Sequence, residues 1–218
     1  MYKVVWLARF AKGLDTAEGR RRWAATHVGF DERPDLGGYI RNFATESFGT
    51  AAPLAIDGYS CCFFKDEAQF ERFNEHTLMR MSPEQGPGTF DMDHMVGMSA
   101  VLREHPVIEG PTGPFKCAWV FRLKDAYRAD ARRYLQSWIS GPWRVPGATR
   151  LLHNVVEHRL GISPGDAGGD RADFDVLTEA WFQEQPSFEW QRPSDLFDVS
   201  WTEAGHAVRL EEFVVKAP

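Results

Sequence analysis

The chain has 218 residues, 43% of them hydrophobic and 26% charged, which is typical of a globular protein with a substantial core, and its net charge of −6 argues against a nucleic-acid or anionic-membrane partner. No apolar run is long enough to cross a bilayer, and the N-terminus carries no signal-peptide pattern. Cys61, Cys62 and Cys117 form neither a CxxC pair nor a disulfide framework, so we expect a reduced, cytoplasmic protein.

The first half of the chain predicts strands and helices in alternation. Its first residues mix β-branched and aromatic side chains densely, which is typical of a buried strand. Asp15 offers an N-cap for a helix, and Pro34 and Gly37-Gly38 mark the loop that follows it. The expected order is strand 2–10, helix 15–28, strand 39–44, strand 56–64, helix 66–75 and strand 95–107, with a loop rich in Met, Pro and Gly over 80–90. This order is the split βαβ pattern of a ferredoxin-like module.

The second half repeats this plan imperfectly. Tyr2-Lys3-Val4-Val5-Trp6 is echoed by Phe115-Lys116-Cys117-Ala118-Trp119. The echo continues at Asn42 and Asn154, at Phe63-Phe64 and Trp181-Phe182, and at Ala100-Val101 and Ala207-Val208. The expected elements are strand 115–123, helix 126–139, strand 149–156, strand 174–182, helix 186–191 and strand 206–215. An internal repeat of this length predicts two similar modules.

The sequence therefore predicts an α+β fold of two tandem ferredoxin-like modules. The first module covers residues 1–108 and the second covers 115–218, with the Gly- and Pro-rich stretch 109–114 as a linker. An antiparallel sheet with helices on one face needs cover on its other face. Two such sheets in one chain can cover each other, and we expect them to form a closed α+β barrel of the kind that many small proteins build by dimerisation.

Three positions differ in chemistry between the two copies. His27, Tyr39 and His94 of the first copy align with Trp138, Leu151 and Trp201 of the second. We expect a working pocket in the first module and a second module filled for stability. Histidine can take and give a proton at neutral pH, and a helix C-terminus stabilises its cationic form. Tyr39 could donate a hydrogen bond to a carbonyl or a developing enolate oxygen. The alternative is a structural His27 that caps its helix.

Several further residues are candidates for substrate binding or support. Trp23 lies four residues before His27 and shares its helix face. Arg41 could orient a carboxylate, and Asp91 could orient the ring of His94. Trp6 and Phe63, with the methionines of 79–98, could line an apolar cavity, although such residues usually belong to the core. Metal binding by the Asp-x-Asp-His run is weakly supported, because no second histidine stands at a ligand spacing. His153 shows no evident acid/base partner, and we assign it no function.

A family resemblance follows from these residues. A strand, a helix ending Trp23-Ala24-Ala25-Thr26-His27, a Pro/Gly loop and then Tyr39-Ile40-Arg41-Asn42 resemble the EthD family of dimeric α+β barrel proteins. The resemblance is best over residues 2–43 and only architectural over 115–216. It implies a cofactor-free enzyme in which the histidine and the tyrosine, here His27 and Tyr39, serve the chemistry. The second copy departs from the pattern at both positions.

Several functions are compatible with these features. The first is a cofactor-independent lyase or isomerase that dehydrates, decarboxylates, cyclises or isomerises an aromatic, phenolic, lactone or polyketide-like compound, with His27 as general acid/base. The second is a cofactor-free monooxygenase of the same barrel, whose substrate reacts with oxygen itself. The others are a non-catalytic binder of small apolar metabolites and a haem-binding variant of the barrel. We expect no metal and no cofactor, an apolar or aromatic small-molecule partner, and leave a homodimer open.

Overall fold

The structure is a computed structural model, and it describes residues 1–26, 29–48, 55–78, 88–91, 99–128, 145–160, 174–186 and 200–218. Its elements in chain order are β1 (Tyr2–Ala8), α1 (Thr16–Thr26), β2 (Gly38–Phe48), β3 (Gly58–Phe64), α2 (Glu67–Leu78), β4 (Ser99–Ile108), β5 (Phe115–Leu123), α4 (Asp125–Arg128), β6 (Ala148–Arg159), β7 (Val176–Phe182) and β8 (Thr202–Lys216). None of the described helices is both long and apolar enough to span a bilayer.

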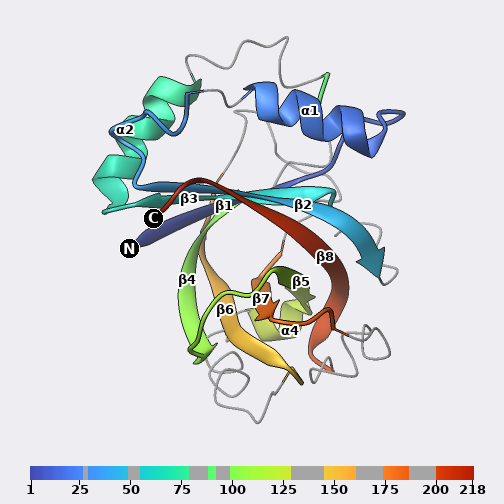
Figure 1. The fold of residues 1–218 in the computed structure, drawn as a ribbon. Helices are drawn as coiled ribbons and strands as arrows, with labels where there is room; N and C mark the ends of the chain where they lie inside the picture. Colours follow the sequence, from blue (N-terminus) through green and yellow to red (C-terminus); the bar gives the residue numbers. More distant parts are fainter. Residues whose placement is uncertain are drawn as a thin grey trace.

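The described strands close into one antiparallel barrel in the order β1-β3-β2-β8-β5-β7-β6-β4. Within it, β4-β1-β3-β2 and β8-β5-β7-β6 are two four-stranded sheets with the same order, the order of a ferredoxin-like module. The two sheets meet at a β2–β8 seam and a β6–β4 seam. The predicted α+β barrel built from two ferredoxin-like modules is confirmed (Figure 1).

Matching hydrogen bonds show the internal repeat in atomic detail. The Asp57 carboxylate, just before β3, accepts the Phe10 N–H at 2.7 Å. The Asp175 carboxylate, just before β7, accepts the Leu123 N–H at the same distance of 2.7 Å. Each aspartate thus anchors the end of its module's first strand.

Because β4 ends at Ile108 and β5 begins at Phe115, we propose that residues 109–114 divide two modules.

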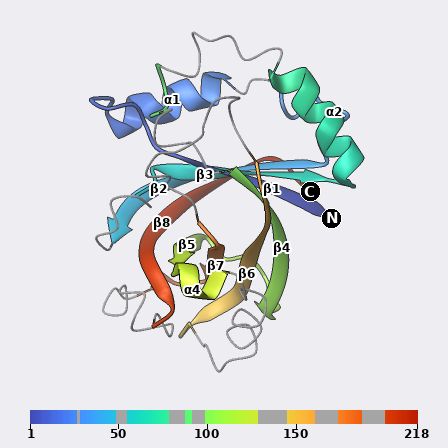
Figure 2. The same ribbon diagram turned by 180° about the vertical axis from the view of Figure 1, so that it is seen from behind.

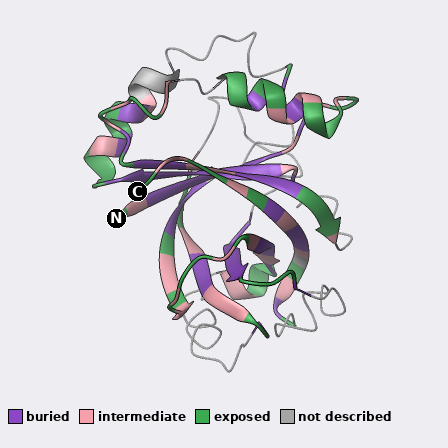
Figure 3. Ribbon diagram, in the orientation of Figure 1, coloured by how far each residue is buried: buried purple, intermediate pink, exposed green. Residues whose placement is uncertain are grey.

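Successive side chains along each strand point to opposite faces of the sheet, one inside the barrel and one outside it. Side chains from both sheets meet inside the barrel in one apolar cluster, which includes Val5, Leu7, Tyr59, Ala118 and Val120. On the outer face of the first sheet, α1 and α2 lie over β1, β3 and β2 in both views (Figures 1 and 2). The central strands are buried along most of their length, whereas much of each helix surface is exposed (Figure 3).

The element boundaries differ from the sequence prediction in several places. Strand 39–44 is wrong in length, because β2 runs from Gly38 to Phe48 and pairs with β8 beyond residue 44. The last strand is also longer than 206–215, since it runs from Thr202 to Lys216 to close the β2–β8 seam. The helix predicted at 126–139 is described only as α4, and its remainder lies outside the described residues. The helix predicted at 186–191 and the start of the strand at 95–107 also lie largely outside them.

Candidate active site on the outer face of the first sheet

Four residues from four adjacent strands form a row on the outer face of the first sheet. Trp6 of β1 lies opposite Ser60 of β3, Ser60 lies opposite Arg41 of β2, and Arg41 lies opposite Phe213 of β8. We call these residues, Trp6, Ser60, Arg41 and Phe213, the first row. Ser60 is buried, whereas the Phe213 ring is 43% exposed and marks the rim on the side of the second copy. Both copies therefore contribute to this face.

Arg41 is the main electrostatic feature of the first row. Its Nε and Nη1 atoms are buried, and neither has a hydrogen-bond partner among the residues that the structure describes. The guanidinium lies 5.9 Å from the ring centre of Tyr39. Arginine stays charged at any physiological pH, and its planar donors match carboxylate or phenolate oxygens. The arrangement can therefore hold an anionic oxygen beside the sheet.

Tyr39 lies two residues before Arg41 on β2, so both side chains face outward. Its ring is 1% exposed and packs 5.2 Å from Phe30. Burial, with a further contribution from Cys62, raises the pKa of Tyr39 well above its ordinary value. The hydroxyl therefore stays protonated at neutral pH, where it can donate a hydrogen bond but cannot act as a base.

A second arginine lies next to this face. Arg20 of α1 stacks 5.4 Å from the ring of Phe43, which follows Arg41 by two residues on the outer face. Phe43 in turn packs edge-on against the first-row Phe213, at 5.5 Å. Arg20 also lines an open groove of about 500 Å³ between α1 and the end of β2, together with Thr16, Ala17, Ala44, Thr45, Glu46, Ser47 and Asp57. Arg20 and the rings of Phe43 and Phe213 thus lie on the same side of the first sheet as Arg41.

Trp23 anchors α1 to the sheet. Its ring is 2% exposed and meets Phe10, Phe43 and Phe90 edge-on at 6.2, 5.2 and 5.4 Å. Such pairs add stability beyond the area they bury. The structure therefore gives Trp23 a packing role, and its predicted part in substrate binding stays a prediction.

The structure does not bring all the predicted residues together. Trp6 packs against the outer cluster that contains Tyr39, whereas Phe63 belongs to the cluster inside the barrel. The two residues lie on opposite faces of the sheet and cannot line one cavity. Asp91 is half-buried, and its N–H donates to the Arg9 carbonyl at 2.9 Å, which ties the segment after Phe90 to the end of β1.

His27 and His94 lie outside the described residues. The last residue of α1 is Thr26, so His27 directly follows that helix in the chain. The catalytic role of His27 and the supporting role of His94 stay predictions. Among the described residues no group of three or more His, Cys, Asp and Glu side chains is placed to hold a metal ion.

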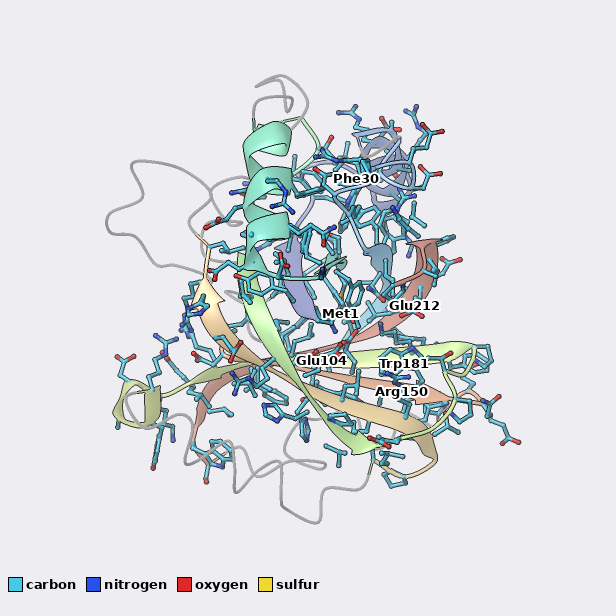
Figure 4. All side chains as sticks on the ribbon, turned by 90° about the vertical axis from the view of Figure 1, so that its left-hand side faces the viewer. Met1, Phe30, Glu104, Arg150, Trp181 and Glu212 are labelled. Carbon is cyan, nitrogen blue, oxygen red and sulfur yellow. The ribbon has the colours of Figure 1, made fainter. Side chains whose placement is uncertain are left out.

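The barrel interior contains a cluster of charges that the sequence reasoning missed. Lys3 donates to Glu104, Asn154 and Glu179, each at 2.9 Å. Lys116 donates to Asn42 at 2.8 Å and to Glu212 at 2.5 Å, and it lies 2.7 Å from Glu179. We call Lys3, Lys116, Glu104, Glu179 and Glu212 the interior ion cluster. Figure 4 shows Glu104 and Glu212 on the same side of the barrel as Met1 and Trp181, with Phe30 farther off towards the helices.

Glu179 is the shared centre of this cluster. Burial alone would lower the pKa of Lys3, but Glu179 and the other neighbours, Glu104 among them, together outweigh burial and raise it. Burial alone would raise the pKa of Glu179, but Lys116 and Lys3 lower it far below its usual range. All three groups are therefore charged at neutral pH. The sequence signal for this cluster was the pair Lys3 and Lys116, which occupy the same position in two repeated, buried strands.

Comparison with known proteins supports the fold. No family model matches the sequence, and no curated protein sequence matches it. The chain is similar to the solved structure of an anthrone oxidase-like protein, with 10% identity and a TM-score of 0.59 over 98% of this chain and 92% of that chain. At this identity the likeness supports the fold alone, an α+β barrel.

Two further solved structures are proposed monooxygenases. The one from Lactobacillus acidophilus NCFM has 11% identity and a TM-score of 0.37 over 99% of this chain and 95% of its own. The one from Fusobacterium nucleatum subsp. nucleatum ATCC 25586 has 10% identity and a TM-score of 0.47 over 99% of this chain and 92% of its own. Their TM-scores are too low to carry an argument about this chain.

Proposed function

We propose that the chain is a cofactor-independent monooxygenase that acts on the anionic form of a phenolic or polyketide-like aromatic compound. The observation that carries this proposal is Arg41, whose buried Nε and Nη1 donors have no partner among the described residues. Aromatic rings stand on either side of it along β2, at Tyr39 and Phe43, and Phe213 stands at the rim. A flat anionic ring would satisfy both the charge and the apolar walls.

The reaction needs only the substrate and oxygen. Loss of a C–H proton from a CH₂ group that is conjugated with a carbonyl through an aromatic ring gives an enolate-type anion, whose negative oxygen Arg41 would stabilise. The enolate carbon adds O₂ and, after protonation, forms a hydroperoxide. Loss of water from this hydroperoxide leaves a ketone, so R₂CH₂ and O₂ become R₂C=O and H₂O. The substrate supplies all the electrons, and one oxygen atom goes to each product.

The neighbour's description agrees with this class of reaction. It is anthrone oxidase-like, and an anthrone carries a CH₂ group of the required kind. Its fold is shared with this chain, but its activity is a property of that protein. We therefore choose anthrone as the first substrate to test.

The test is oxygen uptake by the purified chain with anthrone, compared with an Arg41→Met variant. Removing one preorganised oxyanion donor typically lowers turnover by about 100-fold or more, and we expect a loss of that size in kcat/KM. Arg22→Met is the matched control, because Arg22 lies on exposed α1 and pairs only with Glu18 and a loop carbonyl in the described structure. Equal activity of Arg41→Met and the wild type would refute the role of Arg41.

A lyase or isomerase is the second candidate, and Tyr39 favours it. The buried, protonated hydroxyl beside Arg41 would hold an enolate equally well in a reaction that consumes no oxygen. His27 would then be the general acid/base. Turnover that proceeds at the same rate without oxygen would favour this candidate over the monooxygenase.

Three finer assignments belong with the proposal. Membership of the EthD family rests on the motif from Trp23 to His27 and on Tyr39-Ile40-Arg41-Asn42. A cytoplasmic location rests on cysteines without a disulfide pattern. Because one chain closes the barrel by itself, a homodimer is not required for the fold, and sedimentation of the purified chain would determine whether one forms.

A further inference from the structure

The aspartates that anchor the first strands of the two modules have different surroundings. Asp57 and Asp175 are equivalent, because the Oδ2 atom of each accepts an N–H near the end of its module's first strand. In the second module, the Arg159 guanidinium donates to Oδ1 of Asp175 and to the Phe174 carbonyl, the latter at 3.0 Å. Arg128 Nε lies 3.4 Å from the same carboxylate. The aspartate of the second module is therefore paired with arginine.

Strand register identifies the residue that stands in place of Arg159 in the first module. The Ala44 N–H donates to the carbonyl of the first aspartate at 2.9 Å, and the Val156 N–H donates to that of the second at 3.0 Å. Ala44 and Val156 are therefore equivalent, and a register shift follows each of them along its strand. Three residues farther on, Ser47 occupies the position that Arg159 has in the second module.

The exchange of arginine for serine coincides with an open groove at Asp57. Asp57 and Ser47 both line the groove of about 500 Å³ between α1 and the end of β2, which we call the Asp57 groove. Asp57 is half-buried and Ser47 is exposed, so a ligand can reach both. The groove therefore lies in the first module where the second module has the side chain of Arg159.

The charge of Asp57 is not balanced by a cation of the described structure. Within that part of the chain, the Asp57 carboxylate accepts the Phe10 N–H and forms no ion pair. Arg20, which lines the same groove, donates instead to Glu211 at 3.1 Å and to a backbone carbonyl of β2 at 2.9 Å. Burial lowers the pKa of His206 although nearby Asp57 opposes this, so the histidine is neutral at pH 7. Asp57 can therefore accept a cation from outside the chain.

We propose that the Asp57 groove is a binding site for a small compound that carries a guanidinium group. The guanidinium of the ligand takes the place of the missing arginine, where it donates to Oδ1 of Asp57 and to the Ile56 carbonyl, the counterparts of the two acceptors of Arg159. The volume of the groove is in the range of small-molecule sites. The site is separate from Arg41, and the inference does not depend on the proposed function.

The test compares two probes that have nearly the same shape and differ in charge. Methylguanidinium is a cation at pH 7, and methylurea is neutral. We expect methylguanidinium, at concentrations far below those that unfold proteins, to shift the backbone amide resonances of Ala44, Ser47 and Asp57 in NMR spectra of the full chain. Methylurea should bind about tenfold more weakly or less, because it forms no ion pair. Absence of shifts at Ser47 and Asp57, or equal binding of the two probes, would overturn the proposal.

Two variants test the site in different ways. Asp57→Asn conserves the shape and the acceptor for the Phe10 N–H, and it should weaken methylguanidinium binding by about tenfold or more. Ser47→Arg copies the second module and supplies the guanidinium from the chain itself, so we expect it to abolish binding. It tests the same contact should the asparagine variant fail to fold.

Glu203→Gln is the matched control for the loss of one negative charge. Its side chain is 49% exposed and pairs with Arg122, away from the residues that line the groove. We expect unchanged methylguanidinium binding in this variant. Unchanged binding in a folded Asp57→Asn or Ser47→Arg protein contradicts the inference, and so does an equal loss of binding in Glu203→Gln.

Discussion

Replacement of Glu179 by glutamine tests the interior ion cluster with a minimal change of shape. The carboxylate is 1% exposed, and it contacts Lys3 at 2.9 Å and Lys116 at 2.7 Å. It also accepts hydrogen bonds from the Tyr59 hydroxyl at 2.7 Å and the Asn154 amide at 2.9 Å. Glutamine occupies the same volume but offers one acceptor and an amide N–H₂ that faces an ammonium group. The two buried lysines lose their shared counterion.

The expected cost is large because both lysines stay buried. Removing one partner of a buried ion pair typically costs about 3–5 kcal/mol. The remaining partners, Glu104 and Glu212, have side chains that are 32% and 20% exposed, so solvent weakens their compensation. For a domain of this size, a loss of about 3–5 kcal/mol corresponds to a fall in Tm of about 6–20 °C. It is also a large part of a typical folding free energy of about 5–15 kcal/mol.

Urea titration followed by tryptophan fluorescence would measure this loss. We expect a lower midpoint with an unchanged slope, since the surface exposed on unfolding stays the same. Glu104→Gln is the matched control and should cost about 1 kcal/mol or less, because that carboxylate is partly solvated. A Glu179→Gln variant as stable as the control would refute the reasoning that the cluster depends on its central charge.

Two further predictions concern His153 and Gly58. The pKa of His153 is lowered by burial to about 4, so its contribution to stability is complete above the unfolded value near 6.5 and is lost as the pH falls towards 4. The free energy of unfolding of the wild type should fall between pH 7.5 and pH 4.5. In a His153→Gln variant this fall should be smaller by up to about 3 kcal/mol. An identical pH profile for the two proteins would contradict the prediction. A Cβ at Gly58 would lie 2.3 Å from the Asn42 carbonyl oxygen and 3.2 Å from the Trp23 ring. Gly58→Ala should therefore lower the free energy of unfolding by about 1–3 kcal/mol, measured by urea titration. An unchanged free energy of unfolding would show that β2 and α1 can move apart.

The fold could be predicted because its signals are local and occur twice. The order of the elements could be predicted from strands rich in β-branched and aromatic residues that are separated by Gly and Pro. The second copy of the strand around Lys3, which lies around Lys116, predicted that two similar sheets pair. Strand ends were less predictable, since the length of β8 depends on its partner β2 across the seam and not on its own residues.

The candidate site was predictable only in part. Tyr39 and Arg41 were found from their place beside the Pro/Gly loop, and the structure puts both on the outer face. Phe63 was misplaced because alternation along a short strand does not tell which face is the barrel interior. The interior ion cluster depends on contacts between distant strands, such as that of Lys3 with Glu179, which lie 176 positions apart in the chain. Only the folded sheet brings His105 opposite His153, or Lys3 against Glu179.

The placement of Glu179 has a consequence for the symmetry of the barrel. Its counterpart by register is Cys61, because Val5 lies opposite Cys61 in the first sheet as Ala118 lies opposite Glu179 in the second. Two identical subunits would present either two carboxylates or two thiols to the pair of lysines. A single negative side chain serving both ammonium groups cannot arise in such a symmetric assembly. The centre of this barrel therefore requires two halves that differ in sequence at this position, which a single chain containing both halves provides.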